Sequence, residues 1–478
     1  MRYKDDSLSL HTDLYQINMV EAYREAGIDK KKAVFEVYFR KNPFGNGYVV
    51  FAGLERVINY LKEFRFTDSD LEYLNSLGYE ESFLNYLKEM RFTGTIRSLE
   101  EGQLTFPNVP MMRIETTLAE AQIIETALLN VVNFQSLIAT KASRIKQIIP
   151  NETALEFGTR RAQEMDASIW GARAAYLAGF DATSNVRAGK IFDIPVAGTH
   201  AHALIQAFQD DYKAFKAYAK KHKNCVFLVD TYDTLNSGVP AAIKVAQEED
   251  IHFIGIRLDS GDLAYLSKEA RKMLDKAGFT EAKITASNDL DEETILHLKS
   301  QGAKIDSWGI GTKLITAFDQ PALGAVYKMV AIENEVGELE PTIKISANPE
   351  KVSTPGLKRV YRILNKQMKA EGEYIMLEGE RFEGLKDLEM FNPVHIFQRK
   401  TVENFTAVDL HQTIFEKGKL IYQVPSIEES RLFLKRNLES FWAEYKRITN
   451  PEIYPVDLSR LCWEQKMNKI DEVRNKRS

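Results

Sequence analysis

Cys225-Val226-Phe227-Leu228-Val229 is a run of five apolar residues, the pattern expected of a strand buried on both faces. Similar short apolar or β-branched runs recur on both sides of it, and helix-like segments follow most of them. The spacing predicts eight strands, at 153–157, 181–184, 194–198, 225–230, 252–258, 283–287, 305–310 and 324–330. This alternation predicts an α/β fold, namely an irregular TIM-like (β/α) barrel. A doubly wound sheet is the alternative, because a sequence does not show closure.

The segments on either side of these alternating strands and helices have different sequence patterns. Residues 1–130 mix helical and strand patterns and predict an N-terminal α/β domain. The barrel is expected over residues 131–340, and a long helical pattern from 117 to about 149 leads into it. Residues 341–478, first rich in Lys, Glu and Gly and later helical, are expected to form a C-terminal domain or extension.

The composition limits the classes of function. The 478 residues are 44% hydrophobic and 27% charged, which is typical of a globular protein of two or three domains. The formal net charge of −5 argues against a nucleic-acid partner. Cys225 and Cys462 lie far apart in the sequence and suit a reducing compartment. No run approaches the roughly 18 apolar residues of a membrane span. We therefore expect a cytoplasmic protein with no membrane partner.

Four polar clusters follow predicted strands. They read Glu156-Phe157-Gly158-Thr159-Arg160-Arg161, Gly198-Thr199-His200-Ala201-His202, Arg257-Leu258-Asp259-Ser260-Gly261-Asp262 and Trp308-Gly309-Ile310-Gly311-Thr312-Lys313. In a barrel, the carboxyl ends of the strands converge on one mouth, where catalytic residues lie. Arginines, a histidine, paired aspartates and a glycine-rich turn at that mouth predict a phosphorylated, negatively charged substrate.

Together with Tyr15 in Thr12-Asp13-Leu14-Tyr15-Gln16, these ordered clusters resemble the nicotinate phosphoribosyltransferases over about residues 8–360. The resemblance implies synthesis of nicotinate mononucleotide from nicotinate and phosphoribosyl pyrophosphate (PRPP), with release of pyrophosphate. It also implies coupling to ATP hydrolysis, a need for Mg²⁺, and a place at the first step of NAD salvage from nicotinate. Transfer to nicotinamide or quinolinate is the alternative. Ser184, where nicotinamide-using relatives carry an aspartate, favours the acid.

The resemblance further implies roles for individual charged residues. Arg257 would hold the nicotinate carboxylate, because a guanidinium fork matches a planar carboxylate. The alternative is an arginine in an ion pair at the rim of the barrel. Asp259 and Asp262 suit ribose hydroxyls or a magnesium-bearing pyrophosphate, although Asp259-Ser260-Gly261-Asp262 before Leu263 is also a good N-terminal helix cap.

Tyr15 and Phe157 would form the two faces of an aromatic sandwich around the pyridine ring. Each could instead be a core aromatic residue. Tyr15 would come from the partner subunit, so that a homodimer shares its active sites. Thr199 would donate its hydroxyl toward nicotinate.

A ribose 5′-phosphate region is implied at Arg160, Gly309, Gly311 and Thr312, because glycine lets backbone amides approach an anion closely. A glycine turn after a strand is also a common structural feature. His202 would be the phosphorylated histidine that couples ATP hydrolysis to synthesis. His200 lies two residues away and is the alternative position.

Two competing hypotheses are weaker. The other main phosphoribosyltransferase class ends an apolar strand in two adjacent acids, whereas here Asp230 and Asp233 are separated by two residues. A non-enzymatic binding barrel or scaffold would have no need for Arg257, Asp259 and His202 together.

Overall fold

The computed structural model describes residues 8–346, 348 and 351–475 of the chain. By the contacts within it, the chain divides into two compact units. The central unit is Ile138–Pro321, and the flanking unit combines Met1–Leu137 with Ala322–Ser478. The four polar clusters singled out in the sequence all belong to the central unit.

The central unit is built on a six-stranded sheet with the order β7-β6-β11-β10-β9-β8, in which every neighbouring pair is parallel. Its strands are β6 Thr153–Glu156, β7 Ala182–Thr183, β8 Asn224–Leu228, β9 His252–Leu258, β10 Lys283–Asn288 and β11 Ser307–Ile310. Cys225, Phe227 and Leu228 are fully buried in β8, as expected for a strand covered on both faces. Parallel pairing brings the carboxyl ends of all six strands to the same edge.

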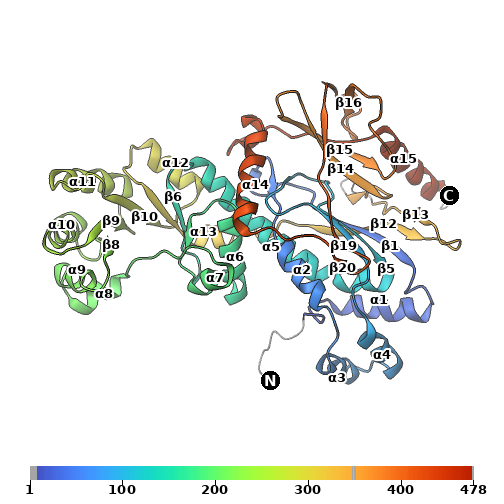
Figure 1. Cartoon of the computed structure of the whole chain (residues 1–478), viewed down its shortest axis with the longest axis horizontal. Helices are drawn as coiled ribbons and strands as arrows, with labels where there is room; N and C mark the ends of the chain where they lie inside the picture. The colour runs from blue at the N-terminus through green and yellow to red at the C-terminus, as the bar shows by residue number, and fades with distance from the viewer. Residues whose placement is uncertain (1–7, 347, 349–350, 476–478) are drawn as a thin grey trace. The chain divides into compact units, whose positions relative to one another are not determined.

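Helices connect these strands, as parallel pairing requires. They are α6 Glu164–Leu177, α7 Val186–Phe192, α8 His202–Phe208, α9 Asp211–Ala219, α10 Val239–Glu248, α11 Leu263–Lys276, α12 Glu292–Ser300 and α13 Thr312–Ile315, with a short π-helical turn at Thr234–Gly238. Helices α9, α10 and α11 lie together beside β8 and β9 (Figure 1). The predicted mixed α/β architecture is therefore confirmed.

The closed barrel is confirmed only as far as this parallel sheet. Within the described residues, β7 and β8 at its two ends do not pair with each other. The predicted strand 194–198 is reduced to one parallel bridge between Thr183 and Val196. The predicted strand 324–330 forms as β12 Val326–Glu333, but it pairs antiparallel with a strand of the flanking unit. The eighth predicted strand is thus not available to the parallel sheet.

The flanking unit has a seven-stranded sheet with the order β13-β12-β1-β5-β3-β19-β20. Its pairs are antiparallel, and its strands are β1 Lys32–Tyr38, β3 Thr95–Ser98, β5 Met112–Thr117, β12 Val326–Glu333, β13 Leu339–Pro341, β19 Gln412–Glu416 and β20 Lys419–Leu420. This sheet joins strands from the beginning, the middle and the end of the chain.

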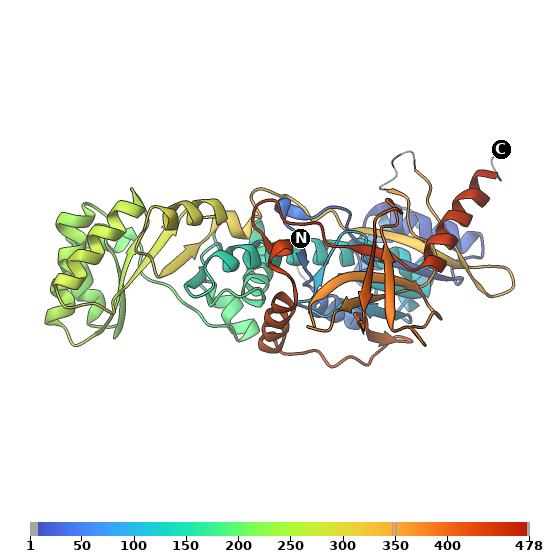
Figure 2. The ribbon, with the colours of Figure 1, turned by 90° about the horizontal axis from the view of Figure 1, so that it is seen from above.

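Smaller sheets and helices complete the flanking unit. The other strands are β2 Val49–Val50 with β4 Leu104–Thr105, β16 Asp387–Phe391 with β17 Arg399–Glu403, and a sheet of β14 Lys358–Leu364, β15 Ala370–Leu377, β18 Thr406–Asp409 and β21 Val456–Leu458. The helices are α1 Leu14–Glu25, α2 Leu54–Glu63, α3 Asp68–Ser76, α4 Glu81–Glu89, α14 Ile427–Ser440 and α15 Arg460–Asn475, with short 3₁₀ turns at Pro43–Gly45 and Ala443–Lys446. Helix α15 (red in Figure 2) packs against β15 (orange).

The long helix predicted to precede the parallel strands is α5 Leu118–Ile148. By length and composition alone it could cross a membrane. However, 67% of its most apolar window is buried inside the structure. Its apolar surface is therefore used in the protein core.

Candidate active site

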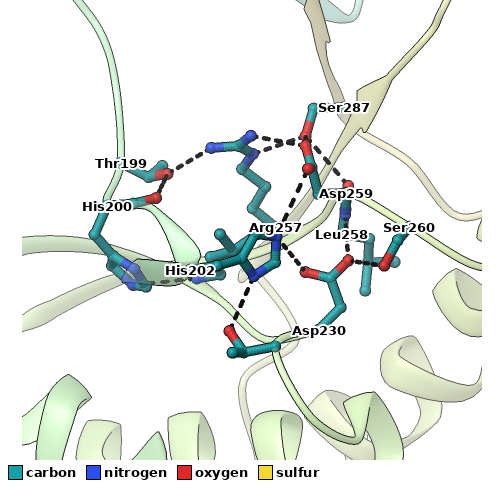
Figure 3. A network of polar contacts seen from close by, with 11 residues as sticks. Thr199, His200, His202, Asp230, Arg257, Leu258, Asp259, Ser260 and Ser287 are labelled. Carbon is teal, nitrogen blue, oxygen red and sulfur yellow. Dashed lines mark hydrogen bonds and ion pairs between the residues drawn. The ribbon is translucent and has the colours of Figure 1, made fainter. Parts of the chain in front are cut away.

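Two of the four polar clusters are joined by hydrogen bonds at the carboxyl edge of the parallel sheet. Arg257 lies on β9, Asp259 directly follows that strand, and Thr199 lies in the irregular segment before α8. Figure 3 shows the Arg257 guanidinium with Thr199 on one side and Ser287 of β10 and Asp259 on the other. A network of hydrogen bonds and ion pairs joins all of these residues.

Arg257 is held by three hydrogen bonds. Its Nε donates to Ser287 Oγ (2.7 Å), its Nη1 donates to Thr199 Oγ1 (3.1 Å), and its Nη2 donates to Asp259 Oδ1 (2.8 Å). A guanidinium has five N–H donors, two on each terminal nitrogen and one on Nε. These bonds therefore leave one N–H on Nη1 and one on Nη2, and the side chain is 15% exposed. Two such donors suit a planar anion.

Asp259 faces both the guanidinium and the histidine. Its Oδ1 also accepts a short hydrogen bond from Ser287 Oγ, and its Oδ2 lies 3.7 Å from His202 Nε2. Burial by itself would raise the pKa of Asp259, but the Ser287 hydroxyl and Arg257 outweigh burial and lower it. Asp259 is therefore a carboxylate at neutral pH, available to a cationic or hydroxyl-bearing group.

His202 is the first residue of α8 and lies within reach of two carboxylates. Its Nδ1 is 3.0 Å from Thr231 Oγ1, and its Nε2 is 4.0 Å from Asp230 Oδ1. The side chain is 37% exposed, so a substrate can reach it. This is the environment of an accessible imidazole with an acidic neighbour on one side.

His200 has a different environment. It is 9% exposed and packs against the rings of Phe215, Tyr218 and Phe227. Its Nε2 accepts a hydrogen bond from the Leu228 backbone N–H (3.2 Å), and burial lowers its pKa to about 4. The geometry thus separates the predicted His202 from the alternative position: His200 is a neutral packing residue, and His202 is the exposed one.

Asp230 was not predicted as a site residue. Its Oδ2 accepts hydrogen bonds from the Asp259 N–H (2.9 Å) and from Ser260 Oγ (2.6 Å), so it holds the turn after β9. Its Oδ1 is buried and has no hydrogen-bond partner among the described residues. The available signal was that Asp230 directly follows the apolar strand that defines the fold. Ser287 and Thr231 were missed as well, because a lone hydroxyl carries no motif.

Phe157 and Gly309 form a packed pair. The Arg257 guanidinium carbon lies 5.5 Å from the centre of the Phe157 ring. A Cβ at Gly309 would lie 2.6 Å from Cδ2 of that ring, and a Cβ at Gly311 would lie 3.0 Å from the Phe157 carbonyl oxygen. Glycine at these positions is therefore explained by close packing against Phe157. Glu156 supports the same loop, since its carboxylate accepts hydrogen bonds from Thr183 Oγ1 and the Gly158 N–H.

The remaining predicted residues lie apart from this network. Arg160 is exposed on the loop after β6 and makes none of the contacts described above. Asp262 caps α11 by accepting a hydrogen bond from the Tyr265 N–H (2.9 Å), which is one of the two roles that the sequence left open. Thr312 begins α13 directly after Gly311.

Tyr15 belongs to the flanking unit, on α1. It is 50% exposed, and its hydroxyl oxygen accepts a hydrogen bond from Gln16 Nε2 (2.8 Å). Burial of its hydroxyl and the nearby Glu125 raise the pKa of Tyr15. An aromatic ring that is half exposed is available for an intermolecular contact.

A magnesium ion would need oxygen ligands from the substrate as well as from the protein. No group of three or more His, Cys, Asp and Glu side chains in the described part of the chain is arranged to hold a metal. Asp259 and the unpartnered Oδ1 of Asp230 are nevertheless suitable, because Mg²⁺ usually takes one or two carboxylates together with phosphate oxygens and water. The residues thus fit an ion that arrives with a pyrophosphate.

Comparison with known proteins covers nearly the whole chain. Models of the nicotinate phosphoribosyltransferase N-terminal domain, family and C-terminal domain match residues 10–133, 153–372 and 357–466. The nicotinate phosphoribosyltransferase of Bacillus subtilis (strain 168) is 65% identical over 478 residues, covering 99% of this chain and 97% of that protein. That of Bos taurus is 32% identical, covering 94% of each. The crystal structure of human nicotinic acid phosphoribosyltransferase has a TM-score of 0.84 at 29% identity, covering 96% of this chain and 99% of that one. The chain belongs to the nicotinate phosphoribosyltransferase family.

Proposed function

We propose that this enzyme transfers the phosphoribosyl group of PRPP to nicotinate, producing nicotinate mononucleotide and pyrophosphate at the first step of NAD salvage. Membership of the family and the 65% identity to the Bacillus subtilis enzyme support this activity. The observation that carries it to the site is the pair of uncommitted N–H donors on Arg257 beside the Phe157 ring. That combination suits an aromatic carboxylate.

The substrate's charge follows from this pair of donors. A carboxylate offers two equivalent acceptor oxygens to one N–H on each terminal nitrogen, whereas an amide offers one acceptor and one donor group. Thr199 accepts a hydrogen bond from the same guanidinium, and its hydroxyl would donate to nicotinate in place of the His200 carbonyl. Ser184, which follows β7, stands where nicotinamide-using relatives carry an aspartate, and a serine adds no charge that would repel a carboxylate. Nicotinamide and quinolinate are the alternatives that the experiment below separates.

Transfer needs electrostatic stabilisation on both sides of the breaking bond. Departure of pyrophosphate builds positive charge on the ribose and negative charge on the leaving group. The ionised Asp259 would stabilise the sugar side or hold Mg²⁺ with the pyrophosphate oxygens, and Asp262 is a further candidate at the same turn. Arg160, Gly309, Gly311 and Thr312 are proposed for the ribose 5′-phosphate.

ATP coupling would proceed through His202. Two carboxylates near Nε2 would repel an incoming phosphate there, which leaves Nδ1 as the attacking nitrogen. Nδ1 would give up its hydrogen bond with the Thr231 hydroxyl, attack the γ-phosphorus of ATP and form a phosphohistidine while ADP leaves. Water later takes the phosphoryl group from His202 as inorganic phosphate, and the energy of that step drives synthesis.

We further infer a cytoplasmic homodimer with shared sites, in which Tyr15 stacks on the pyridine ring in its partner's site. The flanking unit offers cations near Tyr15 that suit a phosphorylated substrate. Glu125 interacts with both Tyr15 and Lys328, and burial together with Arg40 and Lys344 lowers the pKa of Lys328. The parallel sheet and its bridge at Val196 support an irregular barrel as the completed architecture of the central unit.

Pyrophosphate release with nicotinate, nicotinamide and quinolinate, each with and without ATP, tests the proposal. We expect release with nicotinate and stimulation by ATP. Arg257→Ala should reduce kcat/KM for nicotinate by the equivalent of about 2–5 kcal/mol, the usual cost of removing one member of a buried charge pair. The reduction for nicotinamide should be smaller. Arg271→Ala, which removes an arginine paired with Asp275 on α11, is the matched control and should change neither. Greater use of quinolinate or nicotinamide by the unaltered enzyme would contradict the assignment.

A further inference from the structure

Ser287 connects the two charged residues of the site. It lies near the end of β10 and is 3% exposed. In the parallel pairing of β9 and β10, Ala286 is opposite Leu258, so Ser287 follows at the level of Asp259. Its hydroxyl oxygen accepts from Arg257 Nε at 2.7 Å, and its proton goes to Asp259 Oδ1 rather than to the more distant Leu258 carbonyl at 3.4 Å.

These contacts close a ring of three hydrogen bonds (Figure 3). Arg257 Nη2 donates to Asp259 Oδ1, Ser287 donates to the same oxygen, and Arg257 Nε donates to Ser287. One whole edge of the guanidinium is thereby occupied. Rotation of the guanidinium out of its plane would break the bonds of Nε and Nη2 together, so its two remaining N–H donors keep a fixed direction.

We propose that Ser287 is a positioning residue that fixes the Arg257 guanidinium and thereby sets the preference for a carboxylate over an amide. The inference rests on the proposed role of Arg257 with nicotinate. Bidentate recognition depends on direction as well as charge, because both oxygens must meet their donors at the same time. A guanidinium that swings freely still attracts an anion, but it discriminates poorly between an acid and its amide.

Ser287→Ala removes the hydroxyl with little change in volume. Hydrogen bonds to charged groups are stronger than those between neutral groups. We therefore expect kcat/KM for nicotinate to fall roughly tenfold to a hundredfold. The loss should appear mainly in KM. Nicotinamide, measured as a competitive inhibitor so that it need not be turned over, should change its inhibition constant by less than about threefold. Selectivity, rather than activity alone, is the diagnostic quantity.

Ser267→Ala is the matched control. Ser267 is also fully buried in the central unit, where its hydroxyl donates to the Ala264 carbonyl and accepts from the Lys304 N–H. Its removal costs the same kind of hydrogen bonds away from Arg257. It should lower thermal stability comparably to Ser287→Ala and leave the ratio of nicotinate to nicotinamide affinity unchanged.

A double-mutant cycle tests whether Ser287 acts through Arg257. In the Arg257→Ala background, Ser287→Ala should have no further selective effect on nicotinate. Equal losses for acid and amide in the single variant, or fully additive selectivity losses in the double variant, would overturn the proposal. If Arg257→Ala is selective and Ser287→Ala is not, only the positioning role fails. If the unaltered enzyme does not release pyrophosphate with nicotinate, the proposed function itself fails.

Discussion

Gly309→Ala tests why glycine occupies the strand next to the site. The new Cβ would lie 2.6 and 2.7 Å from two carbons of the Phe157 ring, whereas carbon atoms pack at about 3.5–4.0 Å. The ring or the strand must therefore move by about 1 Å. Forcing extra volume into a packed site costs about 1–3 kcal/mol of unfolding free energy. Because Phe157 is proposed to stack on nicotinate, the displaced ring should also raise KM for nicotinate, and by more than KM for PRPP, whose 5′-phosphate Gly309 is proposed to approach.

Denaturant unfolding and steady-state kinetics on the same preparations measure both effects. Gly198→Ala is the control, since a Cβ there meets no atom within 4 Å. Adding Phe157→Leu to Gly309→Ala should restore stability by making room, without restoring nicotinate binding. The opposite pattern, unchanged stability with a raised KM for PRPP, would refute the packing argument. The reason for glycine at 309 would then be only its proposed close approach to the ribose 5′-phosphate.

Three further outcomes are expected. His202→Asn should abolish ATP hydrolysis and acid-labile phosphorylation, while slow ATP-independent synthesis persists. His200→Asn should reduce ATP hydrolysis and phosphorylation much less. Full phosphorylation of the His202 variant would exclude His202 as the acceptor. Mixing inactive Tyr15→Ala with inactive Arg257→Ala protein should restore up to half of normal activity per mixed dimer, and no recovery after proven subunit exchange would place Tyr15 in its own chain's site. Because the pKa of His200 is lowered, the unfolded chain binds a proton at His200 below about pH 6.5, whereas the folded protein does so only near pH 4. The free energy of unfolding should therefore fall by at most about 3 kcal/mol as the pH drops from about 6.5 to about 4. His200→Asn should flatten the pH dependence of the melting temperature, and an unchanged slope would contradict the buried neutral state.

The parallel strands were predictable because their burial is local in the sequence. The apolar run at 225–229 and the polar cluster at 257–262 each indicate a strand or its end without reference to the rest of the chain. Strand β9 was predicted with its observed bounds, His252–Leu258. Which sheet a strand joins depends on its pairing partner, which can lie far away in the sequence. Residues 326–333 look like any other strand, and only pairing with β1, early in the chain, takes them out of the parallel sheet.

The site residues also divide into those that a local sequence motif reveals and those that it does not. Residues in motifs, such as Thr199, Arg257 and His202, were found because several unusual side chains occur together. Ser287 and Asp230 were missed because their importance comes from neighbours on other strands, which the sequence places about 30 residues away. Gly309 and Phe157 were each predicted as site residues, but their contact was not, since they lie about 150 residues apart in the chain.

The flanking unit is interrupted by the central unit, and this order has a consequence for synthesis. Lys32 at the start of β1 bonds to Glu333 across 301 residues, whereas the whole central unit is one continuous segment, Ile138–Pro321. During translation, the central unit can close its contacts as soon as Pro321 has left the ribosome. Strand β1 must wait for β12 and presents unpaired N–H and C=O groups on that side until then. A nascent chain stalled between these points would carry a folded central unit and an exposed edge at β1, which makes the flanking unit the part that most needs a chaperone.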